Sequence, residues 1–292
     1  MNFTRLVYLN TPYGNIELQG YKINPQQEEF SGIRMLLNDG LQWDSKDEHR
    51  YHQTLFVAPY LFVNNKKKKI NVLVLGGGDG LGVRELLKLK GIENITLVDI
   101  NPIMTTLCKE YEPLVEINQN SLNNSKVRII NKDAFEFVQK EKENKKQYDI
   151  IIADYPDPLN IPSPLDKLFS KEHYQDIKDI LNENGVFSLQ ATSVYSMPNV
   201  FRKIQLTIQE VFETQLPLRI NIPSFGDIGI ILAQKKELKI WNMYRKIPQH
   251  IFYDENTFNY FTVFFKDEYP FLKDEIIIDS EIWKLMEYDL TS

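Results

Sequence analysis

The chain has 292 residues, of which 42% are hydrophobic and 25% charged, with 13 glycines and 14 prolines. This composition is that of an ordinary globular protein and excludes collagen-like, low-complexity and disordered chains. The net charge of −6 repels phosphate groups at long range, so we expect no nucleic-acid partner.

Cysteine, histidine and hydropathy patterns bear on the compartment of the protein. Cys108 is the single cysteine, which excludes an intramolecular disulfide and any multi-cysteine metal site and fits a reducing compartment. The four histidines show no metal-ligand spacing, so no metal is expected. No apolar run has the length of a signal peptide or a membrane helix. We predict a soluble, cytoplasmic protein with no membrane partner.

The first part of the chain shows the pattern of antiparallel strands. Short apolar runs alternate with turn signals, at 6–9, 16–19, 33–37 and 41–43. Asn38-Asp39-Gly40 between the last two runs is a tight-turn signal. The lysine run at 66–69 has no interleaved aromatic residues and indicates a solvated connection. We predict a small β-rich domain over residues 1–66 and a second domain over 67–292.

From Ile70 onward, strand patterns alternate with helix patterns, which is typical of a parallel sheet covered by helices. Strands are predicted at 71–75, 95–99, 127–131, 148–154 and 185–190, followed by an antiparallel pair at the sheet edge, 214–221 and 228–234. Helices are predicted to begin near Val83, Pro102, Ala134, Pro164 and Pro198. Residues 67–292 are therefore expected to form a doubly wound, Rossmann-like α/β domain with a seven-stranded sheet.

In such a sheet, ligands bind at the carboxyl ends of the strands. The first strand runs into the glycine-rich segment Gly76-Gly77-Gly78-Asp79-Gly80, where the backbone can approach a ligand closely. Leu81 stands where the dinucleotide fingerprint needs its third glycine, which disfavours NAD. Asp79 would repel a pyrophosphate and favours a ligand with a cationic end, although it could equally cap the next helix.

Two further strand ends carry aspartates. Asp99 ends the second strand, where a carboxylate can accept both hydroxyls of a ribose. Asp133-Ala134 follows the third strand and could contact an adenine, while Asp133 is equally suited to be a helix N-cap. Together with the glycine-rich segment, these ends indicate an adenosine site of the kind used for S-adenosylmethionine. The fold is therefore expected to be of the S-adenosylmethionine methyltransferase type.

The fourth strand ends in Asp154-Tyr155-Pro156-Asp157-Pro158. Two prolines restrict this backbone and make a stiff pair of carboxylates, which we call the acidic lip (Asp154 and Asp157). One carboxylate can hold a cationic ligand while the other accepts the proton that an alkylamine, with a reference pKa near ~10, must lose before it attacks carbon. A plain Asp-Pro turn after a strand is the structural alternative.

These motifs, in this order, resemble those of the polyamine aminopropyltransferase family, the spermidine synthases, from about Leu9 to Ala233. The sequences of these motifs are most similar to those of bacterial members that carry an amino-terminal membrane region. We expect this protein to be a stand-alone catalytic unit without that membrane region. The segments that carry the resemblance are 37–42, 47–52, 76–80, 97–102, 133–134, 154–158, 168–174 and 223–227.

The resemblance implies transfer of an aminopropyl group from decarboxylated S-adenosylmethionine, as co-substrate, to a di- or polyamine, most typically putrescine to spermidine, with release of methylthioadenosine. It implies no permanently bound cofactor, and a homodimer or higher homo-oligomer. Asp154, helped by Tyr51, is expected to accept the amine proton. Nucleoside contacts are expected from Gln42, Gly76, Gly78, Asp79, Asp99, Asp133 and Ala134, and polyamine contacts from His52, Asp79, Asp154 and Asp157.

Some positions depart from the pattern of this family. Leu81 replaces a common glycine, Asp99 is shorter than the usual glutamate, Tyr155-Pro156 replaces small hydroxyl residues, and Gly14 stands where glutamine is common. Two other functions therefore stay open. An S-adenosylmethionine-dependent methyltransferase would use the same adenosine site, and a non-catalytic polyamine-binding homologue would result if Tyr155-Pro156 displaced the base. The acceptor amine is also open, and core packing is the expected role of the aromatic residues after Lys235.

Overall fold

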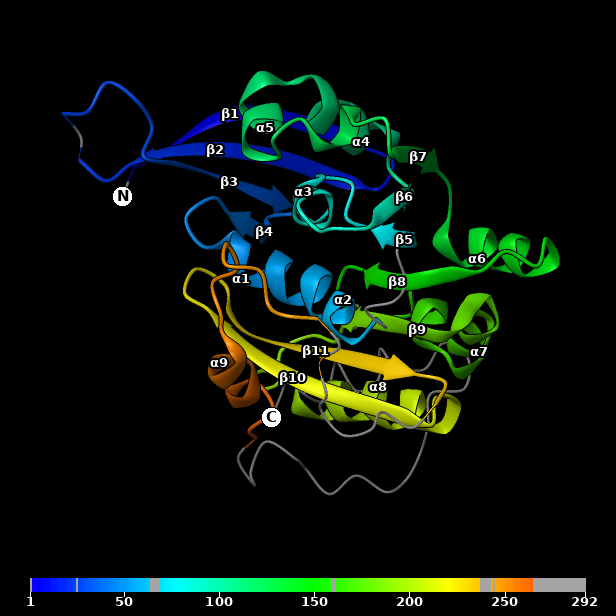
Figure 1. The fold of residues 1–292 in the computed structure, drawn as a ribbon. Helices are drawn as coiled ribbons and strands as arrows, with labels where there is room; N and C mark the ends of the chain where they lie inside the picture. Colours follow the sequence, from blue (N-terminus) through cyan, green and yellow to red (C-terminus); the bar gives the residue numbers. More distant parts are fainter. Residues whose placement is uncertain are drawn as a thin grey trace.

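Two sheets form the frame of the molecule (Figure 1). The computed structural model describes residues 2–24, 26–63, 69–158, 161–236, 243 and 245–264. The expected domain boundary at 66–67 and Phe265 lie outside the described residues. The fold class predicted from the sequence, a small antiparallel unit followed by a doubly wound α/β sheet, is confirmed.

The smaller sheet is antiparallel throughout. Its strands follow chain order: β1 (Asn2–Thr11), β2 (Gly14–Lys22), β3 (Gly32–Leu37) and β4 (Gly40–Asp44). The turn between β3 and β4 has Asn38 at φ 50° and Asp39 at φ 65°, the left-handed pair that a two-residue hairpin needs. Ile16, Leu18 and Met35 are fully buried on the inner face of this sheet.

The larger sheet has the order β10-β11-β9-β8-β5-β6-β7. Its strands are β5 (Ile70–Gly76), β6 (Ile92–Asp99), β7 (Val127–Asn131), β8 (Tyr148–Asp154), β9 (Leu181–Gln190), β10 (Thr214–Ile222) and β11 (Gly226–Gln234). The first five are parallel, whereas β11 pairs antiparallel with both β9 and β10. All seven predicted strands are confirmed, and the antiparallel pair lies at the edge as expected.

Helices follow the strands as predicted, with one displaced start. They are α3 (Leu81–Leu87), α4 (Pro102–Glu110), α6 (Ala134–Glu143), α7 (Lys171–Ile180) and α8 (Pro198–Val211). The helix expected near Pro164 begins instead at Lys171, because the Ser170 hydroxyl accepts a hydrogen bond from the backbone N–H of His173 and caps the helix there. A short 3₁₀ turn, η3 (Asp166–Phe169), precedes it.

Several short helical elements were not predicted from the sequence. Three follow β6 or later strands of the large sheet, at α5 (Glu112–Ile117), η2 (Ser121–Asn123) and α9 (Glu255–Tyr260). The other three form one continuous stretch: α1 (Glu48–His52), the π-helical turn η1 (Gln53–Val57) and α2 (Ala58–Phe62). This stretch was missed because residues 54–62 are almost entirely apolar and buried, which removes the amphipathic period on which helix prediction depends.

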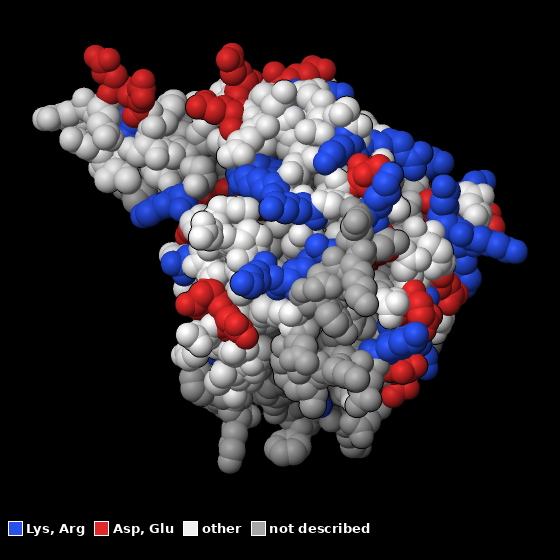
Figure 2. Space-filling model, in the orientation of Figure 1, with Lys and Arg blue, Asp and Glu red and all other residues white. Residues whose placement is uncertain are grey.

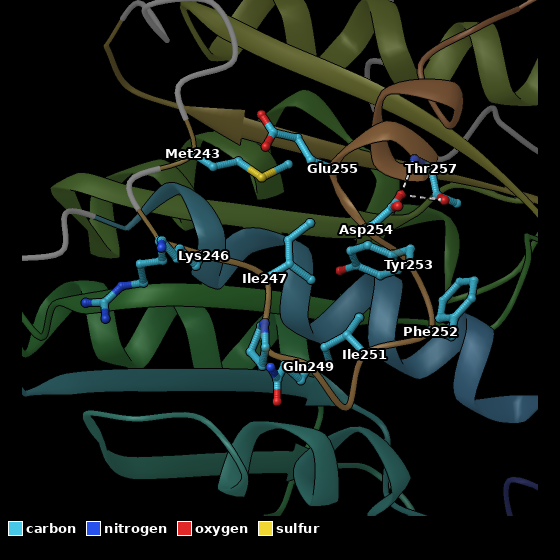
Figure 3. Close-up of a pocket in the computed structure, with 12 residues that line it drawn as sticks. Met243, Lys246, Ile247, Gln249, Ile251, Phe252, Tyr253, Asp254, Glu255 and Thr257 are labelled. Atoms are coloured by element: carbon cyan, nitrogen blue, oxygen red, sulfur yellow. Dashed lines mark hydrogen bonds between the residues drawn. The ribbon is translucent and has the colours of Figure 1, made fainter.

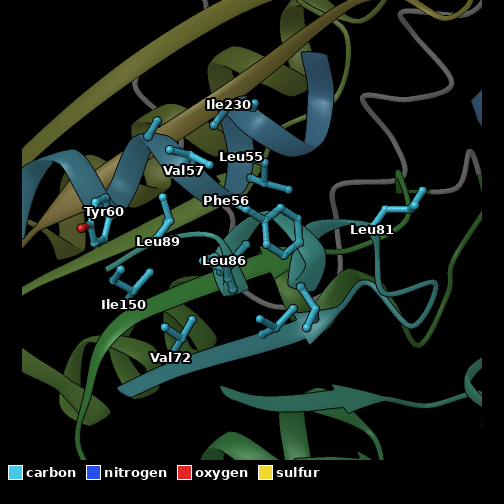
Figure 4. Packing of buried hydrophobic residues seen from close by; sticks show 14 of the residues in the cluster. Leu55, Phe56, Val57, Tyr60, Val72, Leu81, Leu86, Leu89, Ile150 and Ile230 are labelled. Atoms are coloured by element: carbon cyan, nitrogen blue, oxygen red, sulfur yellow. The ribbon is translucent and has the colours of Figure 1, made fainter. Parts of the chain in front are cut away.

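The helical stretch 48–62 packs onto the large sheet, where Figure 1 shows it crossing in front of the strands. The Ser188 hydroxyl of β9 donates a hydrogen bond to the carbonyl of Leu55 at 2.8 Å. A Cβ added at Gly82 on α3 would lie 2.1 Å from the Phe56 ring. Figure 4 shows this ring among aliphatic side chains of α3, β5 and β8. The close fit fixes the stretch against the carboxyl end of the sheet.

Alternate residues of the central strands point to opposite faces of the sheet. One face carries Val72, Val74, Ile150 and Ile152, which share a core cluster with η1, α2 and α3. The other face carries Leu73, Leu75, Ile151 and Ala153, which share a second cluster with α6, α7 and α8. Helices therefore cover both faces, and the strand ends are left as the place where polar side chains gather.

The described part of the chain after Lys235 adds to the first core cluster. Tyr253, Phe258 and Phe261 are buried and their rings contact one another, as core packing predicts, whereas Tyr260 is exposed. Of the residues that the structure describes, no helix is long and apolar enough to span a bilayer.

Candidate active site

The carboxyl ends of β5, β8 and β6 meet at one edge of the large sheet. β5 lies between β8 and β6, and Gly76 pairs with Asp154 in the register of β5 and β8. The chain order reverses at this point, because β6 and β7 extend the sheet on one side of β5 while β8 and β9 extend it on the other. This is the switch point at which open α/β sheets bind their ligands.

The glycine-rich segment at the end of β5 has no space for a side chain at Gly76 or Gly78. Gly76 has φ +83°, and a Cβ there would lie 2.0 Å from the Asp154 carbonyl oxygen. A Cβ at Gly78 would lie 2.4 Å from Oδ2 of Asp99. Glycine is therefore required at Gly76 and Gly78, which places bare backbone N–H groups at the strand end.

Asp79 and Asp99 are both held by backbone N–H groups of neighbouring loops. Oδ1 of Asp79 accepts from the Leu81 N–H at 2.9 Å across Gly80, and Gly80 rather than Asp79 is the N-cap of α3, contrary to the helix-capping alternative. Asp99 accepts from the N–H of Gly78 at 2.9 Å and of Asn101 at 2.8 Å. Burial raises the pKa of Asp99 against these two hydrogen bonds. Each oxygen keeps a second lone pair with which it can accept a ligand hydroxyl or ammonium.

Tyr51 and Asp154 contact each other through a hydrogen bond from the tyrosine hydroxyl to Oδ1 of the aspartate. Burial raises the pKa of Asp154 to about 6, with the nearby Asp79 charge acting in the same direction and the His52 charge against it. Burial and the Asp154 charge hold the pKa of Tyr51 well above 10. Tyr51 is thus the donor of this pair, and Asp154 is the group that can take up a proton near neutral pH.

The acidic lip is anchored from both sides. Oδ1 of Asp157 accepts from the Gln190 side-chain amide, at the end of β9, at 2.7 Å. Between the two aspartates, the Tyr155 ring turns into the core, where its hydroxyl and Nε2 of His173 share a hydrogen bond at 2.9 Å. The large side chain therefore points away from the site, and Asp154 keeps its contact with Tyr51.

Asp133 and Ala134 lie at the start of α6. Oδ1 of Asp133 accepts from the N–H groups of Phe135 and Glu136, so Asp133 is the N-cap of this helix. Its Oδ2 accepts from Lys167 at 2.9 Å. Burial raises the pKa of Asp133, but the Lys167 ion pair and these hydrogen bonds outweigh it and hold the pKa below its usual range. Asp133 therefore caps α6, as one of the two interpretations predicted. A contact between Asp133 and adenine stays a prediction.

His52 is buried one helical turn from Glu48, with Nδ1 2.7 Å from Oε2 of Glu48 and Nε2 3.9 Å from Oδ2 of Asp79. The structure thus brings His52 to the same strand-end edge as Asp79 and Asp154. Gln42 lies on β4 and is exposed, and its side-chain amide donates to the Gly40 carbonyl at 3.3 Å.

Sequence reasoning missed three polar residues around these groups. They are Glu48, Arg84 and Gln190, all buried. The spacing of Glu48 and His52, four residues apart, pairs them on one helix face, but only a predicted helix at 48–52 reveals it. Gln190 ends the predicted fifth strand, next to the strand that ends in Asp154, so its position at the edge could have been inferred.

A separate hollow of about 860 Å³ lies along Met243 and residues 245–257 (Figure 3). None of the candidate site residues lines it. Its carboxylate Asp254 is engaged as the N-cap of α9, accepting from the Thr257 N–H and hydroxyl, as the dashed lines in Figure 3 show. On the outer surface, Lys and Arg gather around α3 (Figure 2). The carboxylates that converge at the strand-end edge, Asp79, Asp99, Asp154 and Asp157, are each partly buried.

The fold and this edge define a Rossmann-like, methyltransferase-type α/β protein whose polar side chains gather at the switch point of the sheet. The spermine/spermidine synthase domain matches residues 48–244. The chain belongs to the spermine/spermidine synthase family, as the sequence motifs predicted.

Curated relatives agree with this family. The polyamine aminopropyltransferase of Leptospira interrogans is 42% identical over 207 residues, which cover 71% of this chain and 40% of the relative. That of Oceanobacillus iheyensis is 36% identical over 269 residues, covering 91% and 50%. The chain thus spans half or less of the length of these relatives.

Two solved structures share the fold. The crystal structure of spermidine synthase from Thermotoga maritima superposes with a TM-score of 0.76 at 23% identity, covering 90% of this chain and 87% of that one. A spermidine synthase in complex with the transition state analogue AdoDATO superposes with a TM-score of 0.77, also at 23% identity and with the same coverage.

Proposed function

We propose that the protein transfers the aminopropyl group of decarboxylated S-adenosylmethionine to a di- or polyamine, with putrescine as the first candidate acceptor. The observation that carries this proposal is the partly buried, hydrogen-bonded Tyr51–Asp154 pair beside Asp79 at the switch point. Family membership and the names of the relatives support it.

The reaction needs an unprotonated amine aligned with a carbon that already bears a good leaving group. The amine nitrogen forms a bond to the propyl carbon next to the sulfonium, and the C–S bond breaks with its electron pair moving to sulfur, which releases methylthioadenosine. The amine proton passes to Asp154, whose pKa of about 6 lets it accept a proton at neutral pH. Tyr51, as a donor to Oδ1, orients this carboxylate and leaves Oδ2 for the amine.

The other carboxylates are assigned to the two ligands. Asp79 takes the aminopropyl ammonium of the donor, Asp99 the ribose hydroxyls, and Asp157 the far end of the acceptor amine. The bare backbone of Gly76 and Gly78 lets the nucleoside approach. Gln42, Asp133 and Ala134 complete the nucleoside contacts, and His52 completes the acceptor side.

The donor preference follows from charge. S-adenosylmethionine carries a carboxylate that Asp79 and the acidic lip would repel, whereas the decarboxylated donor ends in an ammonium that they attract. The alternative of a non-catalytic homologue is less well supported, because Tyr155 packs into the core and Asp154 keeps its hydrogen bond from the Tyr51 hydroxyl. We retain as predictions a two-domain division at 66–67, a homodimer or higher homo-oligomer, a cytoplasmic location, and no permanently bound cofactor.

The test is incubation of purified protein with decarboxylated S-adenosylmethionine and a panel of putrescine, spermidine and agmatine, followed by mass spectrometry. We expect methylthioadenosine and an amine heavier by one aminopropyl group. Turnover only with S-adenosylmethionine would support the methyltransferase alternative, and ligand binding without product would support the non-catalytic one.

A pair of matched variants assigns the chemistry to the strand end. Asp154→Asn should lower turnover by a factor on the order of 10²–10⁴, the usual range for a general base. Asp149→Asn removes a buried carboxylate from the other end of β8, where Asp149 accepts from the Asn71 N–H, and should keep turnover wherever circular dichroism shows it folded. Equal losses in both variants would remove Asp154 from the role of base.

A further inference from the structure

Glu48 is a buried glutamate that the proposed reaction does not use, and it lies directly behind His52. Nδ1 of His52 is 2.7 Å from Oε2 of Glu48 and 2.9 Å from its carbonyl oxygen. Only 6% of Glu48 and 2% of His52 is exposed. Since a carboxylate and a carbonyl only accept hydrogen bonds, Nδ1 must carry a proton.

The opposite edge of the His52 ring faces carboxylates as well. Nε2 lies 3.9 Å from Oδ2 of Asp79, and the charge of Asp154 also acts on the ring. The Tyr51 and Phe56 rings occupy the remaining neighbouring space, with centroids 5.1 and 6.1 Å away. A neutral ring would turn a lone pair toward Asp79, whereas a ring protonated on both nitrogens offers each carboxylate a donor.

Arg84 keeps Glu48 charged. Its Nη2 donates to Oε1 and Oε2 of Glu48 at 2.8 and 3.0 Å, and its Nε donates to Glu85 at 2.7 Å. Burial opposes the charged form of Glu48, but the hydrogen bonds and charges of His52 and Arg84 outweigh it and lower the pKa of Glu48 to about 2. Burial likewise opposes the charged form of His52, yet Glu48 and Asp79 raise its pKa to about 9.

We propose that Glu48 is a positioning residue that fixes His52 as a cation whose Nε2–H edge faces Asp79 and whose charge acts on Asp154. The inference deepens the proposed function, on which its consequence for turnover rests. The positive charge of His52 lowers the pKa of Asp154 and so keeps this carboxylate ionised at a pH where burial alone would protonate it. Glu48 touches no reacting atom and acts through the ring of His52.

The first test needs no activity. Histidine side chains are labelled with ¹⁵N, and the ring signals are titrated by NMR in the wild type and in Glu48→Gln, with His52→Gln assigning the His52 signal. The glutamine keeps an oxygen that can accept the Nδ1 proton but removes the charge, so burial should dominate and the pKa of His52 should fall by roughly three units or more, below that of Asp154. Glu141→Gln is the matched control, because Glu141 is buried and accepts from Tyr148 at 2.5 Å on α6; it should leave the signal unchanged.

The second test is the pH profile of kcat/KM for aminopropyl transfer. Glu48→Gln should move the acid limb upward by about one pH unit, so that its deficit relative to wild type is about tenfold larger at pH 5.5 than at pH 8.5. A purely structural defect would lower kcat/KM by the same factor at every pH. His52→Gln should move the limb in the same direction, which keeps the proposal testable if Glu48→Gln does not fold.

The double variant Glu48→Gln/His52→Gln separates a direct effect from one through the ring. If Glu48 acts through His52, the double variant should have the acid limb of His52→Gln alone. An unchanged His52 pKa in Glu48→Gln, or a further shift in the double variant, would overturn the proposal. If the wild type transfers no aminopropyl group, the proposed function fails while the NMR titration still decides the role of Glu48.

Discussion

The Tyr51 hydroxyl donates a hydrogen bond to Oδ1 of Asp154 across 103 residues of sequence. One partner lies on α1, in the stretch that precedes the large sheet, and the other ends a central strand of that sheet. The contact therefore fixes the orientation of the carboxylate relative to the glycine-rich segment on the neighbouring strand, which a strand end alone would leave free to rotate.

Replacing Tyr51 with phenylalanine should lower kcat by roughly 10- to 100-fold, within the range seen when a group that aligns a catalytic base is lost. Because the tyrosine hydrogen bond lowers the pKa of Asp154, the acid limb of kcat/KM should also move upward. Tyr148→Phe is the control, because Tyr148 is a buried tyrosine that donates a hydrogen bond to Glu141 and lies at the start of β8, at the opposite end from Asp154. A Tyr51→Phe profile identical to wild type would contradict the assignment.

Asp154→Asn should make the protein more stable at neutral pH even as it loses turnover. The folded pKa of Asp154 is raised to about 6 from a reference of 3.8, so the folded state binds more protons between those values and stability falls as the pH rises through that window. The variant removes this cost. We expect a gain of about 3 kcal/mol at pH 8 and almost none below pH 4.

The measurement is urea unfolding of wild type and Asp154→Asn at pH 4, 6 and 8, with midpoints and slopes compared. The same difference at all three pH values would show that burial of an ionised carboxylate is not the source of the gain.

Tyr155 should be a stability residue although it lies between the two aspartates of the acidic lip. Tyr155→Ala leaves a cavity in the second core cluster and should cost about 3–5 kcal/mol. Tyr155→Phe keeps the volume and removes only the hydrogen bond to His173, whose ring is neutral because burial lowers its pKa to about 3; it should cost about 1–3 kcal/mol. Urea unfolding ranks the two, and kcat of folded Tyr155→Phe should match wild type. A loss of kcat without a loss of stability would place Tyr155 in the site.

Asp133 offers a way to separate capping from ligand binding. Asp133→Ser retains an N-cap oxygen and should leave stability nearly unchanged, whereas Asp133→Ala should cost about 1 kcal/mol. If Asp133 also contacts adenine, both variants should weaken methylthioadenosine binding, by roughly tenfold in calorimetry. Normal affinity in Asp133→Ser would show that Asp133 only caps α6 and pairs with Lys167, and does not contact adenine.

Much of the fold was predictable because the central strands of the large sheet are short apolar runs buried on both faces. Val72 and Ile150 on one face and Leu73 and Ile151 on the other show this pattern, and the hairpin turn at 38–39 carries its own backbone signal. The stretch 48–62 was not predictable, since residues buried all round show no period.

The aspartates of the candidate site follow the strand ends and could therefore be placed from the sequence. Asp79, Asp99, Asp154 and Asp157 were found in this way. Residues that act behind them were not, because their partners come from another element: Arg84 reaches Glu48 from α3 only after α1 has packed against it. What sequence reasoning lacks here is the tertiary contact, and no local propensity replaces it.

The separation of Tyr51 and Asp154 along the chain also has a consequence for synthesis. The ribosome must translate past Gln190 before β9 can pair with β8 and Gln190 can bind Asp157 of the acidic lip. Tyr51 is synthesised long before that point. Long-range contacts of this kind form late, since their loop-closure cost comes before any stabilisation. Enzymatic activity of the newly made chain should therefore appear together with the complete sheet, in a single step, rather than grow with the length of the polypeptide.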